Sequence, residues 1–482
     1  MQEITFVVNG TSHLLSFINV PNLERILYSE HYTRVHPAFV WAALALANLM
    51  RSSNSAGQAY GQQPGRGPQG LTVALALFSE AKSAMEIGWA DASYAYAALI
   101  VALFESSAQP TYTHARALNA LIELDDYIHQ MRLTMNDAHH PDVSVYDGVP
   151  VIFYPSDREN LDHRRGCPCP TSPSLSSSVT GSGSLSLDPY SGGGGAKIYI
   201  PPWETTWTQD QIRAEEVRRL CWSALSLVSA FLAQAATDGR RVPAFGLSDA
   251  RSWRLLFPGE VIDRNAQSFN YSDGLTAKES VWALYCRSML LWNYANTRFR
   301  EEVAEVMSEA QTVDESLDMH KCGLDGVLVW TTREYTHNIR MVVTQALRIL
   351  QGYDRGPIPG LYFKRKHAED WVSHQEKIVR QVVAVCQNLV GPEAVQVTER
   401  PWRVQWVFYQ LATCLQLWEY DRTLDEALHL GKKLLQIVDT MNYLWECSEN
   451  RAEAAQLRNR LTDACRLTGV EPPYSPRQMS LR

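Results

Sequence analysis

The sequence is poor in cysteine, with nine in 482 residues. Seven of the nine stand at wide spacings, most of them within apolar helical patterns, which excludes a disulfide scaffold. Reduced thiols that serve as small buried apolar side chains are the expected state. This usage indicates a protein of the cytosol or the nucleus.

Positive charge is also in deficit, because Lys and Arg number 44 against 52 Asp and Glu, a net charge of −8. A basic surface for a phosphate backbone is therefore missing at the level of the whole chain. The longest apolar runs, residues 39–47 and 97–104, fall well short of the ~18–20 residues that a membrane span needs. The N-terminus has no basic region before an apolar stretch, as a signal peptide would. We predict a soluble, intracellular protein without membrane contact.

What the sequence does contain is a globular composition, with 45% hydrophobic and 20% charged residues, enough for most of the chain to bury a core. Apolar side chains recur at three- and four-residue steps, most clearly in residues 71–85, 404–418 and 424–445. Capping-box spacing to a Gln or Glu marks helix starts at Thr208, Thr276 and Thr423. We predict an all-α, multi-helix array of about eleven helices. Strand-like alternation is confined to residues 4–8, 149–154 and 197–200.

Two stretches break the globular composition. Residues 54–70 are rich in Gly, Gln and Pro, and residues 163–197 are rich in Ser, Gly and Pro. Neither can bury enough apolar surface to offset the entropy of ordering it, so we predict a flexible loop and a disordered linker. The linker separates two halves of one helical domain, residues 1–162 and 198–470, and residues 471–482 form a Pro-rich tail.

Residues 124–129, LDDYIH, weakly resemble the aspartate-rich helix with which isoprenoid synthases hold magnesium-bound pyrophosphate. That chemistry needs several carboxylates on one helical face and a second ligand cluster. His129 takes the place of a third carboxylate beside Asp125 and Asp126, and the sequence shows no second acidic cluster. We therefore interpret these residues as an ordinary solvated helix face.

Two further groups of candidate ligands are interpreted as structural. The neighbours His139 and His140 precede a proline in a turn, where they point in different directions and lack a positioned partner for acid–base chemistry. His163, Cys167 and Cys169 offer two or three zinc ligands, whereas a structural zinc site uses four.

A basic run, KRKH, occupies residues 364–367 and is typical of a solvated helix start. The Gly-rich segments 181–183 and 192–195 lack the strand, helix and lysine of a phosphate-binding loop. We predict no catalytic, cofactor-binding or metal-binding residue in this chain, and no enzymatic activity.

Residues 215–227, EEVRRLCWSALSL, are more specific. Glu215 and Arg219 form an acid–base pair one helical turn apart, and Trp222 begins an apolar stripe that would anchor the helix in the core. This stretch resembles the E-x-R-R-x-x-W signature in the regulatory "middle homology" domain of fungal zinc-cluster transcription factors. The residues that carry the resemblance are Glu215, Glu216, Arg218, Arg219 and Trp222, followed by Pro258 and Gly259 in LFPGE.

Other pieces follow in the order of that family, at residues 36–43, 74–105 and 402–447, so that the resemblance covers about residues 14–467. Val228 stands where the family often has Asp. The six-cysteine zinc cluster with which the family reads DNA is absent from this sequence. Zinc is therefore expected only if an upstream cysteine cluster exists, and this chain by itself is not expected to bind DNA specifically.

The resemblance implies a non-catalytic regulatory domain that couples an effector or a protein partner to transcriptional control in the nucleus, or alternatively in the cytoplasm. The implied partners are the transcription machinery or co-regulators, with room for a small-molecule effector and for a homodimer. One alternative is a helical-repeat interaction scaffold, which needs self-similarity at about 34 residues, and no fixed period is found. The other is an all-α enzyme of the isoprenoid type, disfavoured by the missing second acidic cluster.

Overall fold

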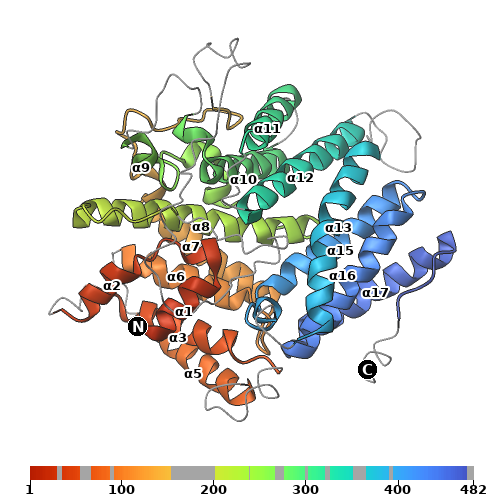
Figure 1. Ribbon diagram of the computed structural model, residues 1–482, viewed down its shortest axis with the longest axis horizontal. Coiled ribbons are helices and arrows are strands. Elements are labelled where there is room, and N and C mark those ends of the chain that lie inside the picture. The colour runs from red at the N-terminus through yellow and green to blue at the C-terminus, as the bar shows by residue number, and fades with distance from the viewer. Residues whose placement is uncertain are drawn as a thin grey trace.

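The computed structural model of the chain describes residues 1–29, 35–54, 67–86, 92–152, 201–237, 239–265, 276–298, 302–320, 326–350, 365–389 and 394–474. These residues form 16 α-helices and short 3-10 turns, with no strand among them, which confirms the all-α prediction (Figure 1). The predicted number of about eleven is too low, because several helices span fewer than three turns, too few for a period to emerge. The stretch 163–197 lies outside the described residues, as do residues 55–66 and 475–482.

The N-terminal part of the chain forms six helices: α1 Gln2–Gly10, α2 Val20–Leu27, α3 Pro37–Met50, α5 Gly67–Met85, α6 Ala92–Glu105 and α7 His114–Gln130. Residues 4–8 are helical and not a strand, because Ile4, Val7 and Val8 share one buried helical face. The helix α5 begins inside the predicted loop 54–70, so residues 67–70 of that prediction are wrong. Of the other strand-like pieces, residues 149–152 carry no strand, and residues 197–200 lie outside the described residues.

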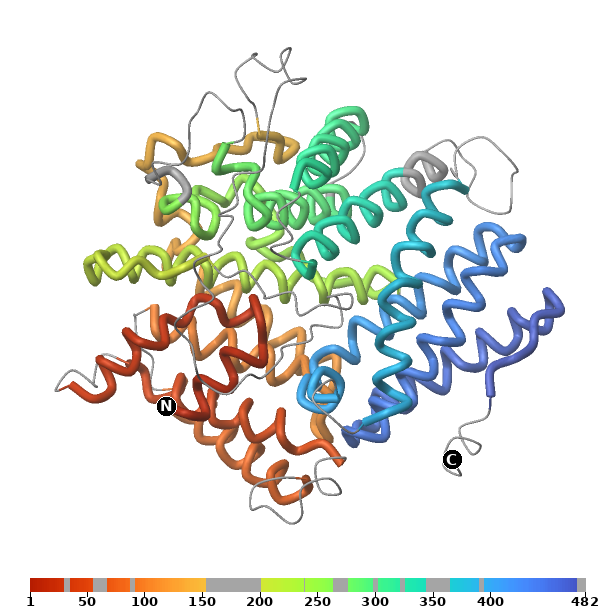
Figure 2. Tube along the Cα trace, in the orientation of Figure 1, coloured from red at the N-terminus to blue at the C-terminus, as the bar shows by residue number. Residues whose placement is uncertain are grey.

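The remaining ten helices follow in two groups. The first is α8 Gln209–Thr237, α9 Glu260–Asn265, α10 Val281–Arg298, α11 Val303–Asp318 and α12 Gly326–Leu350. The second is α13 Arg365–Gln387, α14 Val395–Thr398, α15 Arg403–Tyr420, α16 Asp425–Leu444 and α17 Ser448–Thr468. Figure 2 shows the second group, in blue, gathered on one side of the molecule.

The capping boxes predicted at Thr208 and Thr276 are confirmed. The hydroxyl of Thr208 accepts the backbone N–H of Gln211 at 3.3 Å, and the Gln211 side chain accepts the backbone N–H of Thr208 at 2.8 Å. The box at Thr276 opens a 3-10 turn directly before α10. The box predicted at Thr423 is wrong, because Asp421 accepts both its hydroxyl and its backbone N–H, and α16 begins two residues later.

Two large hydrophobic clusters make up the core. The first contains buried residues from Ile4 to Val343 and takes them from both sides of the undescribed stretch 153–200. The second is built almost wholly from α13 to α17, between Ala368 and Cys465. The stripes predicted in residues 404–418 and 424–445 belong to this second cluster. The two clusters meet where α8 packs against α15.

The helix α8 passes through the middle of the molecule, between the N-terminal helices and α10 (Figure 1). It begins directly after the capping box predicted at Thr208 and runs unbroken to Thr237. Within the described part of the chain it is the one helix long and apolar enough to cross a membrane, and 78% of its most apolar window is buried inside the protein. That burial is typical of a core helix. Trp222, at its centre, is 2% exposed, which confirms its predicted place in the core.

Trp222 should be one of the main stabilising side chains of α8. It stacks on Trp253 at 4.2 Å between ring centroids, and its indole N–H donates to the carbonyl of Leu256 at 3.1 Å. We expect Trp222→Ala to lower the free energy of unfolding by ~3–5 kcal/mol, measured by urea denaturation. Trp41, 39% exposed on α3, provides the matched control, and Trp41→Ala should cost no more than about 1 kcal/mol. A loss under about 1 kcal/mol for Trp222→Ala would contradict its role as an anchor of the core.

Candidate functional site

The structure brings the signature residues of α8 together with the LFPGE segment. Glu215 Oε1 accepts hydrogen bonds from Arg219 Nε at 2.9 Å and from the backbone N–H of Gly259 at 3.0 Å. Glu215 Oε2 accepts from Arg218 Nη1 at 3.2 Å. Arg218 also donates a hydrogen bond to each carboxylate oxygen of Asp137, at 2.7 and 2.8 Å. We call these four charged side chains, Asp137, Glu215, Arg218 and Arg219, the ion cluster.

The ion cluster joins three segments of the chain. Asp137 follows α7, and it also accepts the backbone N–H of Leu256 at 3.0 Å. The guanidinium of Arg219 lies over the ring of Trp203 at 4.0 Å from the ring centroid. All four charges are buried, and two carboxylates face two guanidinium groups, so each charge has an opposite neighbour in the low-dielectric interior. These contacts hold the first half of α8 to the segments around Asp137 and Gly259.

Gly259 closes the turn that reaches the ion cluster. Its φ of +78° lies in the left-handed region, and a Cβ there would come within 2.7 Å of Pro201 Cβ. Glycine is therefore required for both its conformation and its close approach. Pro258, the residue before it, is buried. Glu260 stabilises the turn, because its carboxylate accepts the backbone N–H of Phe257 at 2.8 Å.

Glu216 points to a different neighbour from Glu215. It is 8% exposed and accepts the hydroxyl of Tyr96, on α6, at 3.0 Å. Burial raises the pKa of its carboxyl to about 7, against the lowering effect of that hydrogen bond. The helix α8 thus uses consecutive acidic residues to hold two different parts of the fold.

The interpretation of residues 124–129 as a solvated face is wrong for Asp125. This side chain is 7% exposed, and its carboxylate accepts the backbone N–H groups of Gly246 and Leu247 at 2.7 and 2.8 Å. Burial raises the pKa of Asp125 despite these hydrogen bonds. Asp126 and His129 are exposed, as predicted. Asp125 is therefore already used to hold the 3-10 turn at Gly246–Ser248.

The other candidate ligands are not gathered into a site. His139 and His140 lie in a turn, where a ring nitrogen of His140 accepts the backbone N–H of Asp142 at 3.3 Å. In the basic run, Arg365 pairs with Glu369 at 2.7 Å at the start of α13. Lys364, His163, Cys167 and Cys169 lie outside the described residues. No group of three or more metal-ligating side chains occurs in the part of the chain that the structure describes.

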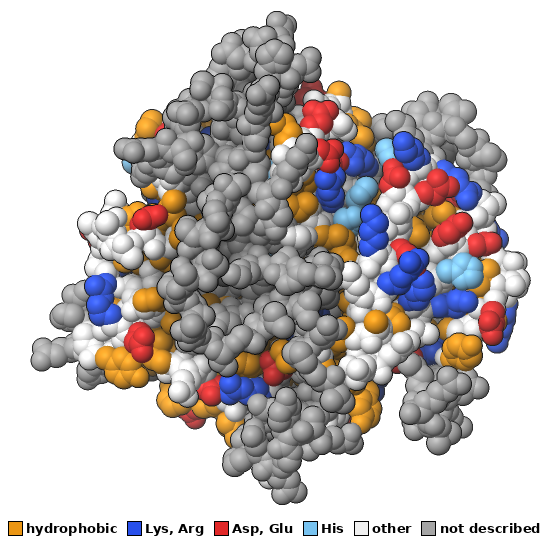
Figure 3. Space-filling view, in the orientation of Figure 1, with side chains coloured by type: hydrophobic (Ala, Val, Ile, Leu, Met, Phe, Trp, Pro, Cys, Tyr) orange, Lys and Arg blue, Asp and Glu red, His pale blue; other side chains and the backbone are white. Residues whose placement is uncertain are grey.

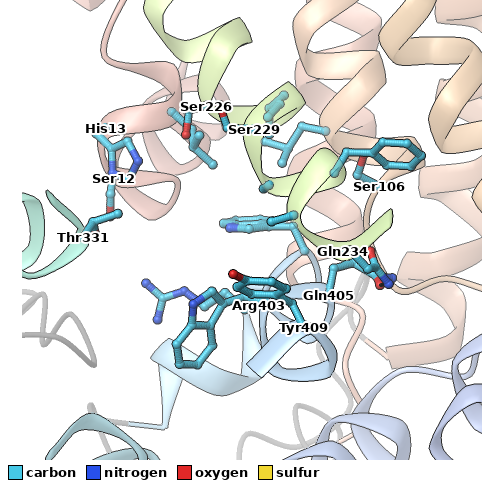
Figure 4. A pocket seen from close by; sticks show the side chains of 18 of the residues that line it. Ser12, His13, Ser106, Ser226, Ser229, Gln234, Thr331, Arg403, Gln405 and Tyr409 are labelled. Carbon is cyan, nitrogen blue, oxygen red and sulfur yellow. Dashed lines mark hydrogen bonds between the residues drawn. The ribbon is translucent and has the colours of Figure 1, made fainter. Parts of the chain in front are cut away.

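A cavity of about 210 Å³ opens at the junction of the two hydrophobic clusters, and we call it the central cavity. The second half of α8 forms one wall with Ser226, Ser229 and Gln234, and α15 forms the opposite wall with Arg403, Gln405 and Tyr409 (Figure 4). Between them lie Thr331 of α12 and the N-terminal residues Ser12 and His13 (Figure 4). Two smaller cavities of about 150 and 100 Å³ share lining residues with it.

Glu334 of α12 is the buried acid of the central cavity, and it is 6% exposed. Its Oε1 accepts the indole N–H of Trp406 at 3.1 Å and a side-chain N–H of Gln410. Burial raises the pKa of Glu334 to about 7, and these hydrogen bonds oppose the shift. The other ionisable side chains that line the cavity are His13, Tyr112, Tyr285, Tyr335, Arg400, Arg403 and Tyr409.

A chain of hydrogen bonds borders the cavity near the N-terminal segment. The hydroxyl of Tyr285 lies 2.9 Å from that of Ser226 and 3.3 Å from a ring nitrogen of His13. Ser12, the residue directly before His13, has a φ of +57°. This left-handed conformation costs about 1–2 kcal/mol for a residue other than glycine. Strain of this kind is common at ligand sites.

Sequence reasoning did not find Glu334. The signal was present, because Val327, Thr331, Glu334 and Asn338 stand four, three and four residues apart and all line the cavity. A stripe of mixed polarity at this spacing resembles a solvated face unless the partners on α15 are known.

The ion cluster yields a test of buried against exposed charge pairs. Asp137→Ala leaves two buried guanidinium groups facing one carboxylate, so we expect a loss of ~3–5 kcal/mol in the free energy of unfolding. The matched control is Asp318→Ala, since Asp318 pairs with Arg333 at 2.6 Å but has a side chain that is 70% exposed. That change should cost ~1 kcal/mol or less. Equal losses for the two variants would show that burial of the cluster carries no weight.

The raised pKa of Glu334 predicts that the free energy of unfolding depends on pH. Its folded pKa of about 7 exceeds the ordinary value of 4.5, so its contribution is fully present below 4.5 and is lost as the pH rises through about 7. The loss is on the order of 3 kcal/mol. Melting curves should therefore show that Glu334→Gln gains stability relative to the unaltered protein across this window and holds the gain above it.

Other groups act on the same profile, which makes the comparison with the unaltered chain necessary. Glu216 titrates in the same sense. Burial lowers the pKa of His337 to about 4 and of His374 to about 3, so their contribution is lost as the pH falls. The control is Glu446→Gln, at a side chain that is 68% exposed, and its profile should follow the unaltered protein. If the stability profile of Glu334→Gln ran parallel to that of the unaltered protein, Glu334 would not be the source of this pH dependence.

The chain was compared with protein-family models, with curated protein sequences and with solved structures. No family model matches it, and no curated protein and no solved structure matches it either.

Proposed function

We propose that this chain is the regulatory domain of a transcription factor, without catalytic activity, and that the central cavity receives its effector. The observation that carries the proposal is the position of the cavity at the junction of the two hydrophobic clusters. Ligand sites are concave, mostly apolar, and provided with a few polar groups. The walls of aromatic rings around Glu334, Ser226 and Gln405 fit that description.

The helix α8 supplies the connection that a regulatory domain needs. Its first half carries the ion cluster, its middle carries Trp222, and its second half forms a wall of the cavity. An effector that binds one arrangement of the two hydrophobic clusters better than another shifts the population toward the arrangement that it prefers. The size of the shift is set by the difference between its affinities for the two arrangements. A rigid buried helix transmits that shift to the segments held by Asp137 and Gly259.

Two observations favour a binding role over the catalytic alternative. The acidic helix of the isoprenoid-type alternative has its Asp125 buried on backbone N–H groups, where it is not placed to hold magnesium. Burial also raises the pKa of the thiols of Cys221, Cys286 and Cys414, so these are not poised as nucleophiles.

The resemblance supports the assignment to transcription, and the surface is compatible with protein partners. On the face shown in Figure 3, Lys and Arg side chains alternate with Asp and Glu over the right-hand part of the view. Mixed charge of this kind suits a polar protein interface better than a phosphate backbone. Co-regulators or the transcription machinery are the partners that we propose, in the nucleus or alternatively the cytoplasm.

Fusion to an unrelated DNA-binding domain tests this function. The fused 482-residue chain should change transcription from a reporter that carries the site of that domain. Ala233→Phe places a ring in the cavity, since Ala233 lines it, and should reduce the response several-fold if the cavity is the effector site. Ala452→Phe, at an exposed position of α17, is the matched control and should leave the response unchanged.

The chain without the fused domain provides the second control. In a mobility-shift series over salt concentration, it should give no complex, or one that salt abolishes without sequence preference. A fused chain that leaves the reporter unchanged would sink the regulatory proposal. A salt-resistant complex of the unfused chain with one DNA sequence would show a DNA-reading element within it.

A further inference from the structure

Glu334 is an acid whose hydrogen-bond partners are neutral. The indole of Trp406 and the amide of Gln410 both donate to its Oε1. Its pKa is raised by burial and lowered by hydrogen bonds from neutral side chains. No positively charged residue is among the described groups that shift it. Buried carboxylates are ordinarily paired with a cation or coordinate a metal. A ligand in the central cavity is in a position to supply that cation.

Aromatic rings surround the same carboxyl group. Burial is the main cause of the raised pKa of Tyr285, Tyr335 and Tyr409, and the charge of Glu334 raises all three further. All three phenols therefore lie within the field of Glu334. All three also line the central cavity, together with Trp406. The faces of such rings attract an ammonium group. Aromatic walls beside an acid are therefore complementary to an organic cation with an apolar body.

The size and the charge of the cavity limit that cation. An apolar cavity of about 150 Å³ accommodates benzene, and the central cavity measures about 210 Å³, so one ring with a short chain fits. Arg400 and Arg403 also line the cavity. Neither guanidinium is among the groups that shift the pKa of Glu334. Glu334 is the one carboxylate among the described residues that line the cavity, so a second ammonium group would have no partner there.

We propose that the central cavity binds a small organic monoamine, with one ring and a short chain, whose ammonium group pairs with the carboxylate of Glu334. This rests on the proposed function, because it takes the central cavity as the effector site. The bond formed is a charge-assisted hydrogen bond between N–H and carboxylate oxygen. Below a pH of about 7, the carboxyl group loses a proton to the solvent as the amine binds.

Calorimetry with a matched pair of probes tests the proposal on the full chain. The probes are 2-phenylethylamine and 2-phenylethanol, which differ in one charged group, at a pH of about 8, where the carboxyl is ionised. The amine should bind with a dissociation constant of about 1 mM or tighter and at least about tenfold more tightly than the alcohol. Glu334→Gln should remove that preference.

Glu216→Gln is the control variant. Glu216 is another buried carboxyl with a raised pKa, but it contacts Tyr96 and lies outside the central cavity. Its change to Gln should leave the preference for the amine intact. Retention of the preference by Glu334→Gln, or its loss in Glu216→Gln, would overturn the pairing.

The outcomes separate this inference from the proposed function. Equal binding of amine and alcohol, with both lost in Ala233→Phe, would overturn the amine class and leave the cavity as a ligand site. Failure of the amine to bind at millimolar concentration would overturn it as well. The regulatory proposal is judged apart from both results, by the response of the reporter to the fused chain.

Discussion

The neutrality of the ion cluster is the constraint on which the rest of the structure depends. The helix α8 lies in the core over most of its 29 residues, yet its first turns carry Glu215, Arg218 and Arg219. Buried charges are tolerated only with opposite charges and hydrogen bonds around them. Asp137 and the backbone N–H of Gly259 supply these. The same contacts fix the position of α8 relative to α7 and to the LFPGE turn, so that the demand for pairing determines how three distant segments assemble.

A second constraint is the contact between the two hydrophobic clusters. Where α8 meets α15, the facing side chains are a mixture of large rings and polar groups, such as Tyr409 and Gln405 against Ser229 and Gln234. Gln234 Nε2 donates to Gln405 Oε1 at 2.9 Å, and each polar group that must be hydrogen-bonded restricts how closely the helices approach. The central cavity follows from this mixture. A site of this kind combines an apolar interior with a few fixed polar groups, which is the condition for selective binding.

Sequence reasoning succeeded where a single segment contains all of the information. The capping box at Thr208 places the start of α8, and the stripe after Thr423 places α16. It failed where a distant segment decides the outcome. Asp125 reads as solvated because its partners, Gly246 and Leu247, lie more than 120 residues away. Glu334 reads the same way, since the indole that meets it belongs to α15. Periodicity records which face is apolar, whereas the burial of a polar group depends on tertiary partners.

The ion cluster also has a consequence for synthesis of the chain on the ribosome. Asp137 precedes its partner Arg218 by 81 residues, whereas Gly259 follows Glu215 by 44. At a translation rate of ~5–20 residues per second, the nascent α8 waits roughly 2–9 s for the turn that completes its cluster. During that interval its long apolar face has no finished core to enter. A nascent helix in this state is the kind of segment that chaperones hold, so the central helix stays open to aggregation until the LFPGE turn has been made.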